Sequence, residues 1–430
     1  MNPLDELRAR GFLDRTTDDA ALDGLLGSAR ESVRESIYVG FDPTADSLHV
    51  GHLLPIIALT HFQRAGHRPI LLVGGATGMI GDPSGRSSER NLLTIEQLQK
   101  NVEGIRAQVA RFLDPDGECG ALVVNNADWI GPMTHLDWLR HVGKHFTMPS
   151  MLAKESVRSR LDQGLSYTEF SYMLLQAYDF LHLFRELGCR IHAGGSEQWG
   201  NITAGIDFIR RVEGQQAYGI TFRLLTTRSG EKFGKSAGNA VWLSEARTSP
   251  FAFHQYWFNS GDADVASLLR LFTFLELGAI EELMREHVEN PDRRQAQSVL
   301  ADEVTRFVHG PAGLERARRA KSVLFDTRLE RLTAADIEAA IADLPVTTIG
   351  REELGRGLAV DQALRPYITR VVQSRGASSR RRRRRVAERE ARGRHPGVRL
   401  TPGGDWSVRA ATSRQAQAGG DHHRKLRMSQ

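Results

Sequence analysis

The sequence predicts an α/β fold built on a parallel sheet, followed by an all-helical domain and a basic, poorly folded C-terminal tail. Three observations lead to this prediction. Short apolar, β-rich runs alternate with amphipathic segments over residues 36–225; helical periodicity alone continues from about residue 249; and from residue 375 the chain is rich in Arg, Gly and Ala. Alternating strands and helices favour a parallel sheet covered on both faces, with ligands at the carboxyl ends of its strands.

Five segments are predicted as strands and three as the helices between them. The predicted strands are 36–41, 68–75, 121–127, 189–195 and 218–225. The predicted helices are 48–66, 94–113 and 168–187. Their apolar residues recur at helical spacing, whereas the strand segments are short and apolar throughout. This order predicts a Rossmann-like domain.

Changes of pattern along the chain predict three domains. Residues 1–245 form the Rossmann-like domain, 246–345 a helical domain, and 346–430 a linker and basic tail. Residues 370–430 hold 17 Lys and Arg against 4 Asp and Glu, a net charge of +13, so residues 1–369 carry −8 of the total of +5. A basic tail attracts polyanions, although a solvated, disordered segment explains the same composition.

Composition and cysteine content narrow the class of protein. The chain has 430 residues, 40% of them hydrophobic, enough for the cores of two or three domains. It contains no apolar run of about 18 residues to span a membrane, and its first twenty residues lack a secretory signal. Cys119 and Cys189 are the two cysteines of the sequence, too few for a disulfide framework or a zinc site. We expect a cytoplasmic protein that makes no membrane contact and holds no resident metal.

A His-x-Gly-His motif follows the first predicted strand. Asp46 or Ser47 is expected to cap the next helix. His49 and His52 then lie in its first turn, where backbone amides and the helix dipole attract anions, and Gly51 leaves room for a flat ligand. The motif favours a polyphosphate and purine site, and two merely exposed or capping histidines are the alternative.

A second motif, SGEKFGKSAGN at residues 229–239, carries Lys232, Lys235 and Ser236 on a loop beyond the last predicted strand. It resembles the phosphate loop of NTPases, but three residues instead of four separate its glycines and no helical apolar run follows. A phosphate-loop NTPase therefore stays an alternative. Lysines on such a loop can still reach phosphates as point charges.

A third pattern places Tyr172, Gln176 and Asp179 at i, i+4 and i+7, on one face of one predicted helix. The neighbouring residues are apolar enough to bury most of this helix. A phenol, an amide and a carboxylate on a buried helix need hydrogen-bond partners, which indicates a binding site instead of a solvated face.

In this order the motifs resemble those of class I aminoacyl-tRNA synthetases: HVGH is followed about 180 residues later by KFGKS. The segments YVGFDPTADSLHVGHL, GGATGMIGDPSGR, TEFSYMLLQAYDF and GGSEQWGNITAG are similar to the bacterial tyrosyl-tRNA synthetase family, over residues 1–345. The resemblance implies a tyrosine–tRNA ligase. Such an enzyme activates L-tyrosine with ATP and Mg²⁺ to tyrosyl-adenylate and diphosphate, holds no tightly bound cofactor, and passes tyrosine to the 3′ end of tRNA(Tyr).

The resemblance also implies roles for individual residues. The implied tyrosine site comprises Tyr38 and Asp179 at the phenol hydroxyl, Asp82, Tyr172 and Gln176 at the ammonium group, and Gln198 near the carboxylate. The implied ATP site comprises Gly40, Asp42, His49, Gly51, His52, Lys235 and Ser236. The implied catalytic residues are Thr44, His49, His52, Lys232 and Lys235, which position the reactants and stabilise phosphate charge. A homodimer is implied as well, with residues 135–153 of a dimer-forming insertion as the predicted contact, and the helical domain at residues 246–345 is implied to bind the anticodon.

The tail departs from this family, whose members usually end in a small RNA-binding domain of the S4 type. Residues 370–430 have few large apolar side chains for a core. Three alternative explanations fit this composition: a divergent domain, a disordered basic arm, or a reading-frame slip in a gene rich in G and C. We favour the slip. It would impair tRNA affinity and leave adenylation intact. A catalytically silent RNA-binding relative is the second alternative.

Overall fold

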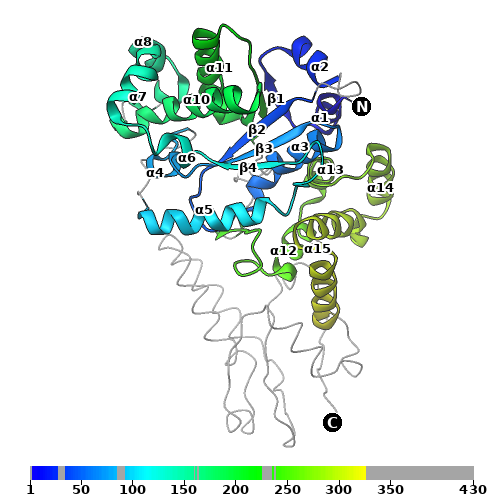
Figure 1. Ribbon diagram of the computed structural model, residues 1–430. Helices are drawn as coiled ribbons and strands as arrows, with labels where there is room; N and C mark the ends of the chain where they lie inside the picture. The colour runs from blue at the N-terminus through cyan, green and yellow to red at the C-terminus, as the bar shows by residue number, and fades with distance from the viewer. Residues whose placement is uncertain are drawn as a thin grey trace, which may run out of the picture. The chain divides into compact units, whose positions relative to one another are not determined.

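A six-stranded sheet lies at the centre of the first part of the chain (Figure 1). Its strands are β1 (Leu13–Thr16), β2 (Ser36–Phe41), β3 (Arg68–Val73), β4 (Leu122–Asn125), β5 (Ile191–Gly195) and β6 (Tyr218–Phe222). They are ordered β1-β6-β5-β2-β3-β4, with β2 to β6 parallel and β1 antiparallel to β6. The α/β prediction is confirmed, and its five predicted strands are all present, shorter by up to three residues at an end.

The structure is a computed structural model that describes residues 2–27, 34–84, 93–158, 160–161, 164–224, 235–236 and 239–325. The helices before β6 are α1 (Pro3–Arg10), α2 (Asp19–Gly27), η1 (Val50–His52), α3 (Leu53–Arg64), α4 (Thr77–Ile80), α5 (Ile95–Val109), α6 (Ala127–Ile130), α7 (His135–His141), η2 (Gly143–His145), α8 (Met148–Leu152), α9 (Glu155–Arg158), α10 (Tyr167–Leu187), η4 (Ser196–Gln198) and α11 (Trp199–Glu213). After β6 follow the two-stranded pair β7 (Lys235–Ser236) and β8 (Asn239–Ala240), and then α12 (Pro250–Phe258), α13 (Asp262–Phe272), α14 (Leu277–Glu289), η5 (Pro291–Arg293) and α15 (Gln295–Phe325).

Helices cover both faces of the sheet. Successive residues of each parallel strand point to opposite sides, so a strand that is apolar throughout has apolar side chains to bury on both faces. On β2, Ile37 and Val39 enter one apolar cluster, with residues of α3 and α5, whereas Tyr38 enters a second cluster with α10. On β3, Leu71 joins the first cluster and Leu72 the second. Figure 1 shows α10 and α11 on one side of the sheet and α5 on the other. Strands buried on both faces explain the continuous apolar runs in the sequence.

The strand order reverses its direction of growth between β2 and β5. From β2 the chain proceeds outward to β3 and β4, and then returns through α10 to add β5 and β6 on the opposite side of β2. In open parallel sheets, ligands bind at the carboxyl ends of the strands beside such a switch point. The sheet therefore places any ligand site beyond the ends of β2 and β5.

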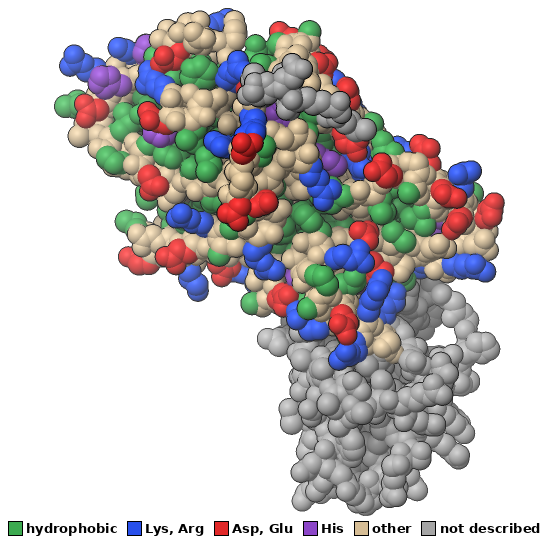
Figure 2. All heavy atoms as spheres, turned by 45° about the vertical axis from the view of Figure 1, so that its right-hand side comes forward, with side chains coloured by type: hydrophobic (Ala, Val, Ile, Leu, Met, Phe, Trp, Pro, Cys, Tyr) green, Lys and Arg blue, Asp and Glu red, His purple; other side chains and the backbone are tan. Residues whose placement is uncertain are grey.

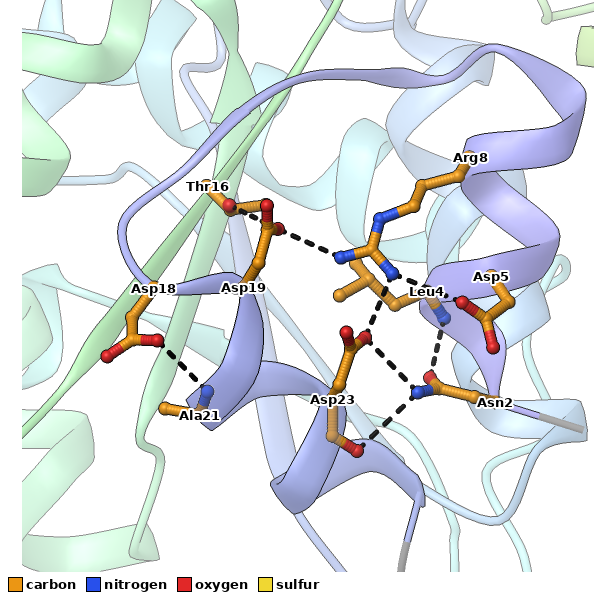
Figure 3. Close-up of polar contacts among 9 residues, drawn as sticks. All are labelled: Asn2, Leu4, Asp5, Arg8, Thr16, Asp18, Asp19, Ala21 and Asp23. Carbon is orange, nitrogen blue, oxygen red and sulfur yellow. Dashed lines mark hydrogen bonds and ion pairs between the residues drawn. The ribbon is translucent and has the colours of Figure 1, made fainter.

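The N-terminal segment adds elements that the sequence pattern did not predict. Strand β1 pairs with β6, and Arg8 on α1 forms ion pairs with Asp19 and Asp23 on α2 and with Asp5 on α1 itself (Figure 3). These charges join the two short helices on either side of β1. The strand has only four residues, and its period-2 pattern is too short to be recognised from the sequence.

The chain divides into two compact units, residues 1–311 and 312–430. In α15, Gly310 has a left-handed backbone, with a φ of 71°, directly before Pro311 at this boundary. Helices α12 to α14 lie within the first unit, so the predicted division at residue 245 stays a prediction. The tail, and with it the expectations made for residues 346–430, lies outside the described residues.

The surface carries both signs of charge. On the face seen in Figure 2, acidic and basic side chains are interspersed over the described residues. In the part of the chain that the structure describes, none of the helices has the length and apolar character needed to cross a bilayer.

Candidate active site

The innermost part of the site joins β2 to β5. Tyr38 and His192 are direct partners in the parallel register of these strands. The Tyr38 hydroxyl oxygen lies 2.8 Å from Nδ1 of His192, and both side chains are buried. Burial lowers the pKa of His192 to about 3, so its ring is neutral. Burial, and secondly the charge of Asp179, raise the pKa of Tyr38 well above its usual value.

Asp179 is a buried carboxylate on α10, the helix that Ser166 caps and Gly188 ends. Asn126 Nδ2 donates to its Oδ2 over 2.9 Å, and Trp129 Nε1 donates to its Oδ1 over 2.8 Å. Burial raises the pKa of Asp179 to about 7, although both donors favour the ionised form. Asp179 is therefore a buried carboxyl group that titrates close to neutral pH, and its charge acts on the hydroxyl of Tyr38.

Asp42 and Tyr172 connect the predicted tyrosine site with the predicted ATP site. Tyr172 donates its hydroxyl proton to Oδ2 of Asp42 over 3.0 Å, and Thr77 Oγ1 donates to Oδ1 over 2.9 Å. Gly74 allows this arrangement, because a Cβ there would lie 2.2 Å from Oγ1 of Thr77 and 2.5 Å from Oδ1 of Asp42. The two subsites thus meet directly after β2.

The side-chain amides of Gln176 on α10 and Gln198 in η4 extend the site beyond the end of β5. Gln198 donates through Nε2 to Oδ2 of Asp82 over 2.7 Å, and its Oε1 accepts from Nε2 of Gln176 over 3.1 Å. Nε2 of Gln176 also lies 3.4 Å from Nε2 of His192. Among the described residues, Oε1 of Gln176 is a buried acceptor without a hydrogen-bond partner. A buried acceptor of this kind fits a ligand that brings its own donor, such as an ammonium group.

The His-x-Gly-His motif begins a helix, but the predicted cap is wrong. The helix begins at Val50 with His49 as its N-cap, because Asp46 forms an ion pair with Arg247 and Ser47 bonds to Gln108 and Ser244.

Nδ1 of His49 accepts from Gly51 N–H, and Nδ1 of His52 accepts from His49 N–H, both over 3.1 Å. A Cβ at Gly51 would lie 2.9 Å from the His49 ring, so this turn requires glycine. The backbone amides of residues 49–52 all donate within the protein, which corrects the expectation that they bind a ligand. With Nδ1 as the acceptor, Nε2 of each neutral ring carries the proton, and burial lowers the pKa of His52 to about 3.

The lysine motif is only partly described. Lys232 lies outside the described residues, and of Lys235 and Ser236 only the backbone is described, in β7. Their strand pairs with β8, so a strand and not a helix follows the lysine, which disfavours the phosphate-loop alternative.

The chain after β8 returns to the histidine motif. The Val50 amide donates to the Val241 carbonyl over 2.9 Å, and Trp242 forms a β-bridge with His49. The two motifs, far apart in the sequence, are therefore held together by backbone hydrogen bonds.

Two remaining predicted residues lie at the end of β2. Gly40 is an exposed strand residue, and Thr44 is exposed and donates its amide to the Asp42 carbonyl over 2.9 Å. Both lie beside Asp42 in the chain, at the carboxyl end of the strand where the switch point places a ligand.

Asn126, Trp129 and His192 are among the residues of the site that sequence reasoning missed. The first two follow β4 in the stretch VVNNADW, and polar residues directly after an apolar strand are a signal that could have identified them. His192 lies inside an apolar strand, where nothing in the local pattern distinguishes it from a structural histidine. Among the described residues, no group of three or more His, Cys, Asp or Glu side chains is arranged to hold a metal ion.

Comparison with known proteins shows which proteins this chain resembles in sequence and fold. The family model for class I tRNA synthetases (W and Y) matches residues 31–326. The tyrosine–tRNA ligase of Roseiflexus castenholzii is 53% identical over 365 residues, 84% of this chain and 85% of that protein. The tyrosine–tRNA ligase of Geobacillus stearothermophilus is 50% identical over 347 residues, 80% of this chain and 82% of that protein. A C-terminally truncated mitochondrial tyrosyl-tRNA synthetase of Aspergillus nidulans has a TM-score of 0.67 and 30% identity, covering 75% of this chain and 94% of that one.

Proposed function

The chain belongs to the class I tRNA synthetases of the tryptophan and tyrosine group, and on this premise we propose how its residues carry out the reaction of a tyrosine–tRNA ligase. The enzyme activates L-tyrosine with ATP, forming tyrosyl-adenylate and diphosphate, and then transfers the tyrosyl group to the 3′ end of tRNA(Tyr). In the first step an oxygen of the tyrosine carboxylate attacks the α-phosphorus of ATP, and the bond from that phosphorus to the bridging oxygen of diphosphate breaks. No side chain has to act as a nucleophile.

The observation that carries this proposal is the pair of buried polar side chains Tyr38 and Asp179. The pair supplies a buried hydroxyl and a buried carboxylate, and two further donors hold the carboxylate in place. A site built to hydrogen-bond a phenol hydroxyl rejects a ligand that lacks it, as is known for this enzyme family, because its buried polar groups then stay unpaired. Phenylalanine is therefore a poor substrate.

The other end of the amino acid meets Gln176 and its neighbours. The buried Oε1 of Gln176 accepts from the ammonium group, and Asp82 and Tyr172 complete its surroundings. The carboxylate of the substrate tyrosine then lies near Gln198 and points toward the proposed ATP site at Asp42. Each of these roles is a proposal that rests on the hydrogen-bond network of the site.

The histidine motif supports the adenylation step. Because Nδ1 of His49 and of His52 accepts a backbone hydrogen bond, the Nε2–H of each ring is oriented by the turn and donates to phosphate oxygens. Lys232, Lys235 and Ser236 act from the neighbouring loop, and Thr44 from the turn after β2. Mg²⁺ enters with ATP as part of the substrate and neutralises phosphate charge.

The proposal extends to partners and location. The enzyme works on tRNA(Tyr) as a homodimer in the cytoplasm, where its two cysteines stay unbonded thiols. Six of the large exposed hydrophobic side chains support a dimer surface between residues 136 and 167: Leu136, Leu139, Met148, Leu152, Leu161 and Tyr167.

The test of the function is tyrosine-dependent exchange of radioactive diphosphate into ATP. Exchange with tyrosine and almost none with phenylalanine or tryptophan is expected. ATP hydrolysis without tyrosine would indicate an NTPase, and no exchange at all would indicate a silent RNA-binding relative. Equal rates with tyrosine and phenylalanine would contradict the assignment of the Tyr38 and Asp179 pocket.

A further inference from the structure

A directed chain of hydrogen bonds leads from Asp82 toward Tyr38. Oδ2 of Asp82 accepts from Nε2 of Gln198 over 2.7 Å. Because a carboxylate only accepts, Gln198 must turn its amide nitrogen to Asp82 and its Oε1 away from it. That oxygen accepts from Nε2 of Gln176 over 3.1 Å and from Nδ2 of Asn201 over 3.2 Å. The amide nitrogen of Gln176 therefore faces Gln198, and its orientation is determined by the carboxylate two steps away.

The same nitrogen of Gln176 decides which nitrogen of His192 carries the proton. Nε2 of His192 lies 3.4 Å from Nε2 of Gln176, which is a donor. A donor facing Nε2 requires that nitrogen to accept, so the single proton of the neutral ring lies on Nδ1. Nδ1–H then donates to the hydroxyl oxygen of Tyr38 over 2.8 Å. Burial keeps the pKa of His192 at about 3, so the ring is neutral at the pH of the reaction.

We propose that His192 is a positioning residue of the tyrosine pocket: its Nδ1–H occupies the acceptor side of the Tyr38 hydroxyl and thereby turns the Tyr38 proton toward the phenol oxygen of the substrate. This inference rests on the proposed function, since it specifies how the same pocket recognises its substrate. Tyr38 donates a hydrogen bond to the phenol oxygen, and the phenol hydroxyl donates a hydrogen bond to the carboxylate of Asp179. Both hydrogen bonds of the substrate hydroxyl are then made.

The opposite tautomer of His192 would remove this recognition. With the proton on Nε2, two donors would face each other between His192 and Gln176, and Nδ1 would accept the Tyr38 proton. The phenol oxygen would then face Tyr38 without receiving a hydrogen bond. The tautomer is thus coupled through Gln176 and Gln198 to Asp82, at the ammonium end of the site, so both ends of the pocket share one network.

The direct test is nitrogen NMR of full-length enzyme labelled with [¹⁵N]histidine. The signals of His192 are identified as those absent from the His192→Gln variant. We expect a neutral ring from pH 6 to 8 whose unprotonated, pyridine-type nitrogen couples to both carbon-bound ring protons, which identifies it as Nε2. A protonated Nε2, or a doubly protonated ring, would overturn the proposal. This readout needs no activity, so it stays decisive even where the diphosphate exchange of the wild type fails and the proposed function with it.

Kinetics give a second test through a matched pair of variants. His192→Leu removes the donor, and we expect the KM for tyrosine in diphosphate exchange to rise about tenfold, with kcat changed less than threefold. His192→Gln keeps one donor and one acceptor, and its KM is expected within threefold of wild type. Equal losses in both variants would contradict the proposal, because a purely packing role does not distinguish them.

A double-mutant cycle is the third test, and it measures whether Tyr38→Phe and His192→Leu affect the KM for tyrosine independently. Because His192 acts through the Tyr38 hydroxyl, Tyr38→Phe combined with His192→Leu should raise the KM no further than Tyr38→Phe alone. Multiplied losses would overturn the proposed connection. Thermal unfolding of each variant verifies that it is folded, and the NMR result on the wild-type protein decides the matter if His192→Leu does not fold.

Discussion

Asn126, at the end of β4, donates through Nδ2 to Oδ2 of Asp179 on α10 over 2.9 Å. The Oδ1 of Asn126 accepts from the backbone N–H of Ala76 over 2.7 Å, so this amide can present only its nitrogen to the carboxylate. A backbone group thereby fixes the orientation of a side chain that supports the buried charge. The relationship joins segments 53 residues apart and supplies the first prediction.

Asn126→Ala should weaken tyrosine binding at neutral pH. The carboxylate of Asp179 then keeps Trp129 as a donor and loses the other, so its pKa should rise further and less of it should be ionised. We expect the KM for tyrosine at pH 7 to rise about tenfold. Asn101→Ala is the matched control: it removes a buried asparagine that donates to the Pro43 carbonyl, and should lower the melting temperature without moving the pH dependence of KM.

The affinity for tyrosine should depend on pH through Asp179. Its pKa is raised from 3.8 to about 7, so the carboxylate that is proposed to accept a hydrogen bond from the phenol hydroxyl forms as the pH rises through that value. The KM for tyrosine should fall between pH 5.5 and 8 and level off above, and Asp179→Asn should abolish the change. His52 and His192 do not titrate in this window, because the pKa of each is about 3. A flat profile in the wild type would contradict the role of Asp179.

The histidines of the motif should act in the transition state. His49→Ala and His52→Ala should each lower the rate constant of adenylation by about 100-fold in stopped-flow measurements, with tyrosine affinity changed little. The variant His49→Asn separates loss of the proposed phosphate contact from loss of the turn structure. Its asparagine Oδ1 can still accept from Gly51 N–H, whereas the Nε2–H of the histidine is lost. We expect it to be folded and slow. A collapse of tyrosine binding at an unchanged rate would place these residues elsewhere.

The dimer surface can be tested at its most exposed apolar residue. Leu136 on α7 is 76% exposed, and Leu136→Lys would place a charge in the proposed apolar contact between two copies of the chain. Sedimentation equilibrium should show a weaker dimer. Val288→Lys on α14, equally exposed, should leave the association unchanged. A wild-type chain that is monomeric at micromolar concentration would contradict the prediction.

Removal of the tail should separate the two steps of the reaction. A chain cut after residue 345 keeps every proposed site residue and should form tyrosyl-adenylate at nearly the wild-type rate. Its tRNA binding should weaken without preference for sequence, and the dependence of affinity on salt should become shallower, because 17 Lys and Arg lie beyond residue 369. Amides protected from hydrogen exchange beyond residue 375 would show instead that the tail is a folded domain.

Much of the fold could be predicted from the sequence because it follows from local pattern. Apolar runs of strand length, separated by helical periodicity, predicted the five parallel strands and helices α3, α5 and α10. The spacing of Tyr172, Gln176 and Asp179 predicted one buried polar face, because helical geometry alone decides which side chains share it. The antiparallel β1 was missed since four residues carry too little pattern, and the cap at Asp46 or Ser47 was wrong because both bond to distant segments.

What the sequence by itself determined was the five parallel strands, helices α3, α5 and α10 between them, the polar face of α10 and the order in which the motifs occur. Tertiary structure alone decided the partners: His192 for Tyr38, and Asn126 with Trp129 for Asp179. The physical reason is that a buried polar group must find a hydrogen-bond partner, but strand order, set by long crossovers, decides which group it meets. The apolar character of residues 36–41 indicates that Tyr38 lies on a buried strand. Only the placement of β5 beside β2 brings the imidazole of His192 next to the Tyr38 hydroxyl, whose proton it is proposed to orient.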